Sequence, residues 1–208
     1  MTVFAYIATF FTFCALLLEV FTLLGNTHNQ PFLKSLYFAR LTLPDQFIQF
    51  GLWNYCIGNG NEVTHCSSPV AAFDWTKADE LSNIADALHG MSNLFLVIFI
   101  LYWVTFGLTL FAITITILSH FRRGPDFLAS FSTFLSFLLM LVIFIMTLVV
   151  SLRGINEAKG MDKNASGNLG PSTWMTLGAF AGLMLASLMY CVTCIFGPGK
   201  HVREIEEA

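Results

Sequence analysis

Hydrophobic residues gather into four long runs, and polar residues fill the segments between them. The runs lie at about residues 4–24, 91–118, 127–152 and 174–196. A helix needs about 20 apolar residues to cross the hydrocarbon core of a bilayer, and each run reaches that length. The pattern therefore predicts an all-α membrane protein, a four-transmembrane-helix bundle in a single domain over residues 1–208.

Composition agrees with this prediction, because 56% of the 208 residues are hydrophobic and 11% are charged. A soluble domain carries about 25% charged residues. The N-terminal run has no basic segment before it and is long enough to span, so we expect a retained helix rather than a cleaved signal peptide. A net charge of −3 without an extended basic patch disfavours nucleic acid as a partner.

The second and third runs are joined by a short segment that holds Arg122 and Arg123. So short a connection predicts an antiparallel pair of helices. The positive-inside rule places these arginines in the cytoplasm, and both chain termini are then expected there as well. The two longer loops would face outward. One of them carries the sequence Asn164-Ala165-Ser166, which makes Asn164 a candidate glycosylation site.

The first long loop, residues 26–90, contains a predicted β-hairpin. Alternate residues share one face of the strand that leads into it: Phe47, Gln49, Gly51, Trp53, Tyr55. Cys56 and Cys66 are spaced symmetrically about Asn61, and the turn-forming sequence Gly58-Asn59-Gly60-Asn61 lies between them. In such a hairpin the two cysteines come within the Cα separation that a disulfide tolerates. Closing this short loop would stabilise the fold by roughly 3 kcal/mol in the chain-entropy model.

Short elements are expected on either side of the hairpin. Residues 32–38 could form a strand or a short interfacial helix. The sequence Thr76-Lys77-Ala78-Asp79 has the pattern of a capping box, which predicts a short helix that begins there. Acidic side chains in its first turn would complement the helix dipole. We therefore expect the acidic residues of this segment to be solvated rather than to bind a divalent cation: Asp74, Asp79, Glu80, Asp86.

The sequence Gly51-Leu52-Trp53-x-x-Cys56, followed after nine residues by Cys66, resembles the signature of the claudin superfamily. With the segment from Pro31 to Phe38 ahead of it and phenylalanine-rich spans, the chain is similar to the fungal Sur-seven/PalI family of tetraspan plasma-membrane proteins. The resemblance implies a claudin-like fold, in which the four-helix bundle carries a small disulfide-bonded extracellular β element.

The same resemblance implies a function. It is a non-catalytic role in organising a fungal plasma-membrane domain of the eisosome type and in supporting cell-wall and membrane integrity. The PalI branch of the family implies an alternative, an accessory of an ambient-pH signalling receptor. Two further alternatives stay open, a cation-permeation or transport component and a claudin-type adhesion or barrier protein.

Within the motif, Leu52 and Trp53 have two interpretations. They could anchor the hairpin at the membrane surface, where an amphipathic indole is stable, or present a patch to a neighbouring molecule, as claudin-like loops do. We expect the anchor. The loop departs from that of vertebrate claudins, because no Trp precedes Trp53 and His89 rather than Arg precedes the second span. This difference disfavours a tight-junction function.

Glu19 is the acidic residue that lies well inside a predicted span, roughly 9 Å below the outer end of the first helix at 1.5 Å per residue. An intramembrane carboxyl is costly and is by default a candidate functional site. The alternative is a structural side chain, hydrogen-bonded to a Thr, Ser or Tyr of a neighbouring helix or reaching His89. A proton or cation relay would need a chain of such groups, so we expect the structural role.

The last span carries two further features. Gly178, Gly182 and Ala186 recur every four residues, a small-residue row that lets another helix approach closely. The row could pack within the bundle or join two copies of the chain, and we expect the former. Cys191 and Cys194 lie at the inner membrane boundary, where cysteines are candidates for S-palmitoylation, with buried inert thiols as the alternative.

Catalysis is not indicated by the sequence. Five histidines are spread along the chain without the spacing of metal ligands: His28, His65, His89, His120, His201. We find neither a paired nucleophile and base nor a phosphate-binding glycine loop. The chain is therefore expected to have no enzymatic activity, cofactor, metal or small-molecule substrate. Its expected partners are the lipid bilayer and, through lateral association, further copies of itself or other membrane proteins.

Overall fold

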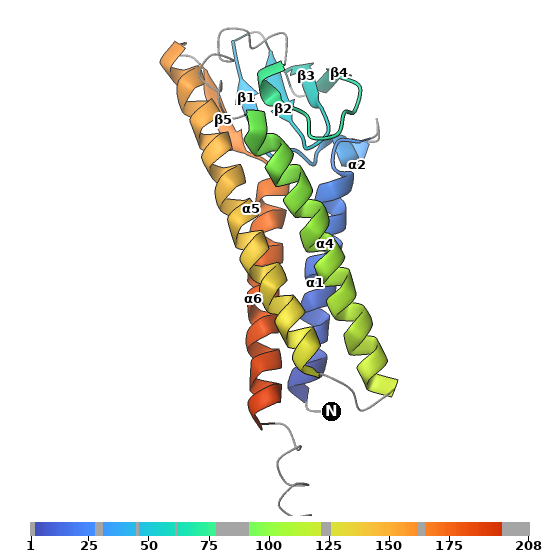
Figure 1. Ribbon diagram of the computed structural model, residues 1–208. Coiled ribbons are helices and arrows are strands. Elements are labelled where there is room, and N and C mark those ends of the chain that lie inside the picture. The colour runs from blue at the N-terminus through green and yellow to red at the C-terminus, as the bar shows by residue number, and fades with distance from the viewer. Residues whose placement is uncertain are drawn as a thin grey trace, which may run out of the picture.

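In the part of the chain that the structure describes, four long helices run side by side and carry a small β-sheet at one end (Figure 1). The helices are α1 (Val3–Leu24), α4 (Ser92–Phe121), α5 (Asp126–Met161) and α6 (Pro171–Phe196). Each contains a stretch long and apolar enough to cross a membrane. The computed structural model describes residues 3–27, 31–44, 46–60, 62–77, 92–121, 126–161 and 165–196.

The predicted four-helix membrane bundle is confirmed, and two of its helix boundaries are corrected. α5 continues to Met161, well beyond the predicted end of the third span at residue 152. On this extension Ile155 and Ala158 are buried, and Ile155 packs against β5 of the sheet. This tertiary contact stabilises the helix after its apolar run has ended. α6 begins at Pro171 rather than at residue 174, and proline suits the first helical turn because its missing N–H has no helical partner there.

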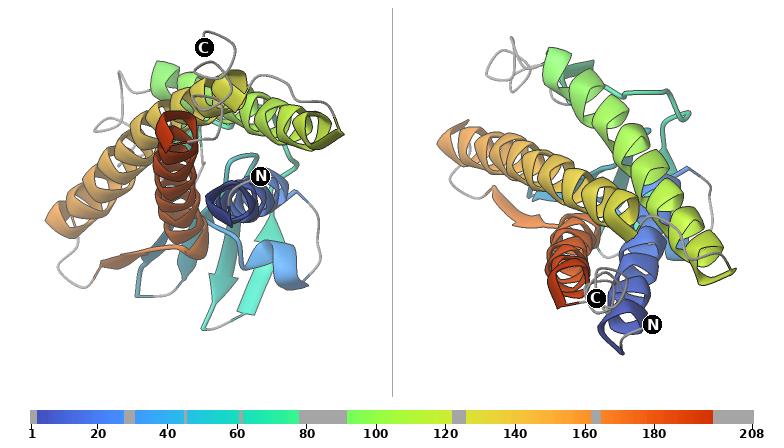
Figure 2. Two further views of the ribbon diagram at one scale, coloured as in Figure 1. Left: turned by 90° about the horizontal axis from the view of Figure 1, so that it is seen from below. Right: turned by 60° about the horizontal axis from the view of Figure 1, so that its bottom comes forward.

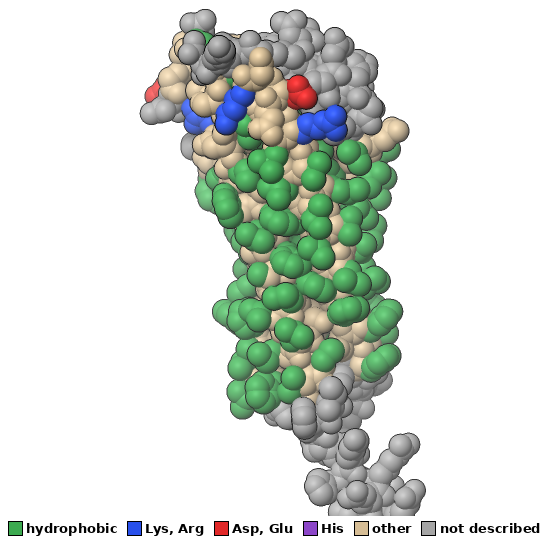
Figure 3. Space-filling view, turned by 90° about the vertical axis from the view of Figure 1, so that its left-hand side faces the viewer, with side chains coloured by type: hydrophobic (Ala, Val, Ile, Leu, Met, Phe, Trp, Pro, Cys, Tyr) green, Lys and Arg blue, Asp and Glu red, His purple; other side chains and the backbone are tan. Residues whose placement is uncertain are grey.

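The helices form a ring in which α1 packs against α4 and α6, and α5 packs against the same two helices (Figure 2). On the face shown in Figure 3, apolar side chains cover most of the length of the bundle. This belt ends in Lys and Arg side chains at the sheet-bearing end. Such a distribution of apolar and charged groups is the one that a bilayer requires of a spanning protein.

Among the described residues the sheet has five antiparallel strands in the order β4-β3-β2-β1-β5. Four come from the first loop, namely β1 (Ala39–Thr42), β2 (Phe47–Phe50), β3 (Tyr55–Asn59) and β4 (Glu62–Cys66). The fifth, β5 (Ser166–Leu169), comes from the connection between α5 and α6 and pairs with β1. The two loops at this end of the bundle therefore form one structural unit.

The predicted hairpin is present, but the strand expected to lead into it is divided. β3 and β4 pair with Cys56 directly opposite Cys66. Residues 47–55, which the alternation predicted as one strand, are instead β2, a turn, and the start of β3. Gly51 N–H donates to Asn54 O in this turn at 2.9 Å, which reverses the chain. The alternating pattern continues across the tight turn, so periodicity could not reveal the reversal.

Two short helical turns lie before and after the strands of the first loop. α2 (Pro31–Lys34) is a single turn at the start of the segment for which a strand or helix was expected. η1 (Trp75–Lys77) is a 3₁₀ turn in which Asp74 Oδ1 accepts hydrogen bonds from the backbone N–H and the hydroxyl of Thr76. Asp74 rather than Thr76 therefore caps this turn. The rest of the predicted helix, which includes Asp79, Glu80 and Asp86, lies outside the described residues.

Candidate functional site

The motif residues Gly51 and Leu52 lie between the sheet and the adjacent end of the bundle, in the turn that joins β2 to β3. A Cβ atom at position 51 would lie 2.9 Å from Cβ of Asn26, so glycine is required for the close approach of this turn to the end of α1. Leu52 is 7% exposed and belongs to the main hydrophobic core. Leu52 is therefore neither a membrane anchor nor part of an exposed patch, and both interpretations of its role are wrong.

Trp53 connects the sheet to two helices. Its indole Nε1–H donates to the carbonyl oxygen of Leu23 in α1 at 2.6 Å, and its ring packs edge to face on Phe99 of α4, with ring centroids 5.0 Å apart. The carbonyl groups in the last turn of a helix have no partner within that helix. Trp53 supplies a partner for one of them, so a side chain from the sheet caps the first helix of the bundle.

Neighbouring carbonyl groups at the end of α1 also find partners. Gly25 N–H donates to Thr22 O at 3.3 Å, and the hydroxyl of Thr27 donates to Leu24 O at 2.7 Å. With the bond from Trp53, the carbonyl groups of residues 22, 23 and 24 are each hydrogen-bonded. The last three carbonyl groups of α1 are thus paired at the point where the sheet rests on it.

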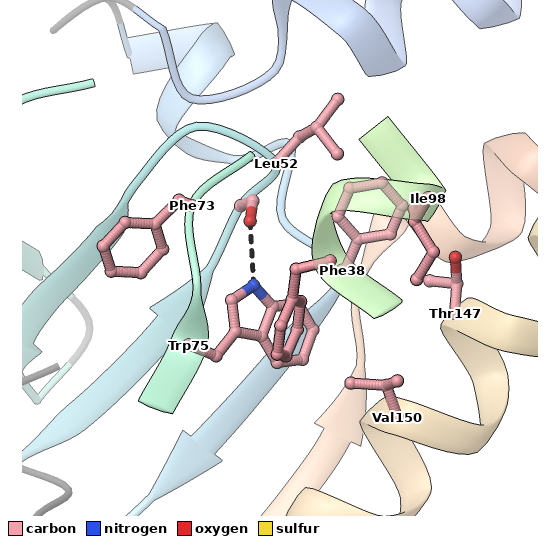
Figure 4. A pocket seen from close by; sticks show the side chains of 9 residues that line it. Phe38, Leu52, Phe73, Trp75, Ile98, Thr147 and Val150 are labelled. Atoms are coloured by element: carbon pink, nitrogen blue, oxygen red, sulfur yellow. Dashed lines mark hydrogen bonds between the residues drawn. The ribbon is translucent and has the colours of Figure 1, made fainter. Parts of the chain in front are cut away.

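Trp75 makes a second connection between the sheet and the bundle. Its ring stacks on Phe50 of β2 at 4.8 Å and contacts Phe95 of α4 at 5.2 Å, measured between ring centroids. Its Nε1–H donates to Gly51 O at 3.1 Å, the dashed line in Figure 4. Figure 4 also shows the small, mostly apolar pocket beside it, which Thr147 of α5 helps to line. Sequence analysis missed Trp75, although a lone Trp between the hairpin and the second span was an available signal.

Cys56 and Cys66 form a disulfide bond, with an S–S distance of 2.04 Å and a Cα–Cα distance of 4.0 Å. Cys56 is completely buried, and its Sγ lies 3.1 Å from Oδ1 of Asn26. Asn26, two residues after the end of α1, has a positive φ of 61°, a conformation that asparagine tolerates better than most residues. The disulfide therefore packs on Asn26, two residues beyond the end of the first helix, as well as joining β3 to β4.

Glu19 is completely buried inside the bundle. The hydroxyl of Thr109 in α4 lies 3.1 Å from Glu19 Oε1 and 2.9 Å from the carbonyl oxygen of Thr105, and it can donate to either. Glu19 Oε2 and the Thr105 hydroxyl have no hydrogen-bond partner among the described residues. The structure thus places Glu19 beside two threonines of a neighbouring helix. His89, the other partner considered from the sequence, lies outside the described residues.

Two tyrosines make further polar contacts between helices. Tyr102 of α4 is completely buried and hydrogen-bonds to Thr176 of α6. Closer to the opposite end of the bundle, the Tyr190 hydroxyl lies 3.2 Å from the hydroxyl groups of both Thr9 in α1 and Thr116 in α4. Hydrogen bonds between helices in lipid contribute about 0.6 kcal/mol each on average. Sequence analysis missed them because threonine is compatible with lipid-facing and buried positions alike.

The small-residue row of α6 packs against α1. A Cβ atom at Gly178 would lie 3.1 Å from Cδ1 of Leu18, and one at Gly182 would lie 3.4 Å from the carbonyl oxygen of Phe11. Ala186 is completely buried farther along the same helix. Gly182 and Ala186 therefore serve close packing within the chain, whereas Gly178 lies exposed at the edge of this contact.

The remaining candidate modification sites are only partly described. Cys191 is a free, exposed cysteine near the end of α6, with its Sγ 3.7 Å from Oγ of Ser130. Cys194 belongs to the last turn of α6, but its side chain is outside the described set. Asn164 also lies outside the described residues. Acylation of the two cysteines and glycosylation of Asn164 stay predictions.

Comparison with known protein families extends over nearly the whole chain. Residues 4–195 match the SUR7/PalI family. The chain belongs to this family. A search of curated proteins found no match.

For this SUR7/PalI protein the family match and the structure agree on a multi-pass membrane protein of claudin-like fold. The matched region includes the first loop, whose Gly51, Leu52, Trp53, Cys56 and Cys66 indicated the family from the sequence. In the structure these five residues meet at one place. Together they seat the sheet on the ends of α1 and α4, so the motif fixes the orientation of the sheet on the bundle.

Proposed function

We propose that this SUR7/PalI protein organises a domain of the fungal plasma membrane of the eisosome type, and thereby supports cell-wall and membrane integrity. Family membership supports the proposal. The structural observation that carries it is the fixed seating of the sheet, in which Trp53 bonds to α1 and Trp75 packs on α4. A sheet held this way moves with its bundle as one body. When two bundles contact each other in the membrane, the distance between their sheets is therefore fixed as well.

Lateral association would use the outer faces of the helices, because Gly182 and Ala186 of the small-residue row pack within the chain. Large aromatic side chains are exposed on these faces, among them Phe10 of α1, Trp103 of α4 and Phe131 of α5. Contacts between such side chains in lipid depend on shape and van der Waals packing. Further copies of this chain and other membrane proteins are the partners that this surface would accept.

We infer that the sheet-bearing end faces the outside of the cell and that both termini are cytoplasmic. α1 begins and α6 ends at the end opposite the sheet (Figure 1). α4 ends and α5 begins at that same end, and the sequence that joins them contains Arg122 and Arg123, so the positive-inside rule favours the cytoplasm for this end. The disulfide at the sheet-bearing end supports the same orientation, because such bonds persist in oxidising surroundings.

Fluorescence imaging of the tagged chain in fungal cells tests the proposed role. Immobile patches at furrows of the plasma membrane, without recovery after photobleaching, are expected, together with sensitivity to wall stress on deletion. A four-span plasma-membrane protein that diffuses freely serves as the control. Uniform, mobile fluorescence combined with loss of alkaline-pH signalling on deletion would instead identify the PalI-type accessory.

Ion permeation has one observation in its favour, a carboxyl oxygen of Glu19 inside the bundle that has no hydrogen-bond partner among the described residues. A Glu19→Gln variant removes the ionisable group and keeps the shape and the oxygen that can accept from Thr109. Under the proposed organising role, cation flux through vesicles that contain the protein should equal that of protein-free vesicles for both wild type and variant. A wild-type flux that this substitution abolishes would favour permeation.

A further inference from the structure

A polar groove lies on the face of the sheet opposite Trp75, beside α2 and the start of α6. It is broad, with about 1140 Å³ between its walls including the open side. The residues that line it are Lys34, Ser35, Tyr37, Arg40, Gln49, Glu62, Val63 and Pro171. Arg40 and Gln49 are directly opposite each other on β1 and β2, so their side chains share this face.

Gln49 is the buried polar group of the groove. Its side chain is 5% exposed, and its Oε1 has no hydrogen-bond partner among the described residues. A buried amide oxygen without a partner is unfavourable, and a ligand hydroxyl or amine that enters the groove would relieve it. The wall of the groove thus offers an acceptor for a hydrogen-bond donor.

Two cations lie beside this amide. The guanidinium of Arg40 is held 3.8 Å above the ring centroid of Phe47, and its Nη2 makes one long hydrogen bond, 3.4 Å to Gly60 O. Within the described residues neither Lys34 nor Arg40 forms an ion pair. Guanidinium and ammonium groups form their strongest hydrogen bonds with phosphate or carboxylate oxygens. The groove therefore combines two cations that outnumber its one acidic side chain, Glu62, with a buried hydrogen-bond acceptor.

The groove lies at the level where the apolar belt of the protein ends. Pro171, which lines it, is the first residue of the membrane-crossing stretch of α6. Lys34 follows closely on α1, whose membrane-crossing stretch ends at Leu24. Figure 3 shows Lys and Arg side chains along the same boundary. Groups at this boundary face lipid headgroups.

We propose that this groove binds the anionic, hydroxyl-bearing headgroup of a membrane lipid, a phosphorylated polyol such as phosphoinositol. Lys34 and Arg40 bind the phosphate oxygens, and Gln49 accepts a hydrogen bond from a hydroxyl group of the polyol. The inference does not depend on the membrane-domain role proposed above, since it rests on the groove alone.

Calorimetric titration of the full-length protein in detergent with dioctanoyl phosphatidylinositol tests the proposal. Binding should be at least about tenfold tighter than that of dioctanoyl phosphatidylcholine, because the choline head has no hydroxyl group for Gln49 and carries a positive charge that Lys34 and Arg40 repel. The double variant Lys34→Gln/Arg40→Gln should lose that advantage. Its matched control is Arg153→Gln/Lys159→Gln, which removes two exposed cations on α5 that do not line the groove. This control should stay within about twofold of wild type.

Gln49→Leu separates recognition of hydroxyl groups from recognition of charge. It should weaken binding of phosphatidylinositol and leave binding of dioctanoyl phosphatidic acid unchanged. If the Arg40 variant does not fold, Lys34→Gln alone carries the test, because Lys34 lies in a single-turn helix at the surface. Each variant is checked for the Cys56–Cys66 disulfide.

Three results would overturn the proposal. Equal affinities for phosphatidylinositol and phosphatidylcholine would show that the groove does not recognise the headgroup. Equal losses of binding affinity in the Lys34/Arg40 double variant and in the Arg153/Lys159 double variant would show unspecific attraction to surface charge. Free inositol 1-phosphate that binds as tightly as the lipid would assign the groove to a soluble ligand instead.

Discussion

The indole nitrogen of Trp53 lies 2.6 Å from the carbonyl oxygen of Leu23, which joins the turn between β2 and β3 to the end of α1. On the other side of the same turn, Trp75 donates its indole N–H to Gly51 O at 3.1 Å. Two tryptophans from different parts of the loop thus hold one turn in place. The position of the sheet on the bundle depends on this pair of hydrogen bonds and on the rings that carry them.

Replacing Trp53 by Phe should lower the free energy of unfolding by about 1–3 kcal/mol, because Leu23 O loses its partner while the contact with Phe99 is largely kept. The measurement is thermal or denaturant unfolding of the purified protein in detergent. Trp103→Phe is the control, since Trp103 is 46% exposed on α4 and should change stability by less than about 0.5 kcal/mol. Equal effects of the two substitutions would contradict the capping role.

Removing the disulfide with Cys56→Ser/Cys66→Ser should cost about 3 kcal/mol of stability, because the unfolded chain regains the freedom of the open loop. Folded yield and delivery to the cell surface should fall with it. Cys191→Ser, at a free and exposed cysteine, should leave the free energy of unfolding unchanged. Mass spectrometry of the mature protein reports the bond directly, and free thiols at positions 56 and 66 would rule out the pairing.

Gly182→Val should destabilise the protein by about 1–3 kcal/mol, because the new side chain meets the backbone of α1 at Phe11 and forces the two helices apart. The oligomeric state, measured by light scattering in detergent, should not change. Gly107→Val in α4 is the matched control, since a Cβ atom there meets nothing within 4 Å. A variant at position 182 that keeps its stability but loses self-association would contradict packing within the chain.

Gly170→Ala should loosen the pairing of β5 with β1, since a Cβ atom at position 170 would lie 2.1 Å from the carbonyl oxygen of Tyr37. Gly170 N–H also donates to Phe38 O at 2.7 Å, so its backbone cannot move away without breaking this bond. We expect a loss of about 2 kcal/mol or more and faster amide hydrogen exchange over Ser166–Leu169. Gly154→Ala in α5, where a Cβ atom has open space, should show neither effect.

Sequence alone predicted the elements that depend on neighbouring residues. The length of each apolar run set the spans, and the spacing of Cys56 and Cys66 around a turn indicated the hairpin and its disulfide. The continuation of α5 beyond residue 152 could not be predicted from the same pattern. There the helix is stabilised by contact with the sheet, which includes Ile155 against Gly167, rather than by its own apolar run.

In the candidate site, too, the sequence predicted which residues matter, while the structure showed their contacts. The sequence singled out Gly51, Leu52 and Trp53 as a unit, but not what each residue does. Alternation along one strand cannot show that the strand turns back at Gly51, nor that Leu52 is thereby buried. The hydrogen bond from Trp53 to Leu23 joins residues 30 positions apart, and it can form only when the sheet packs on the helices in this orientation.

By itself the sequence determined the membrane spans, the disulfide-bonded hairpin and the family, because hydrophobic length and motif spacing are properties of the chain read locally. Tertiary structure alone decided that β5 completes the sheet, that Trp53 caps α1, and that the small residues of α6 face α1. Each of these contacts joins segments distant in sequence. Which partner a segment finds is set by the packing of the whole bundle, since a buried surface or polar group is stable only beside the groups that complement it.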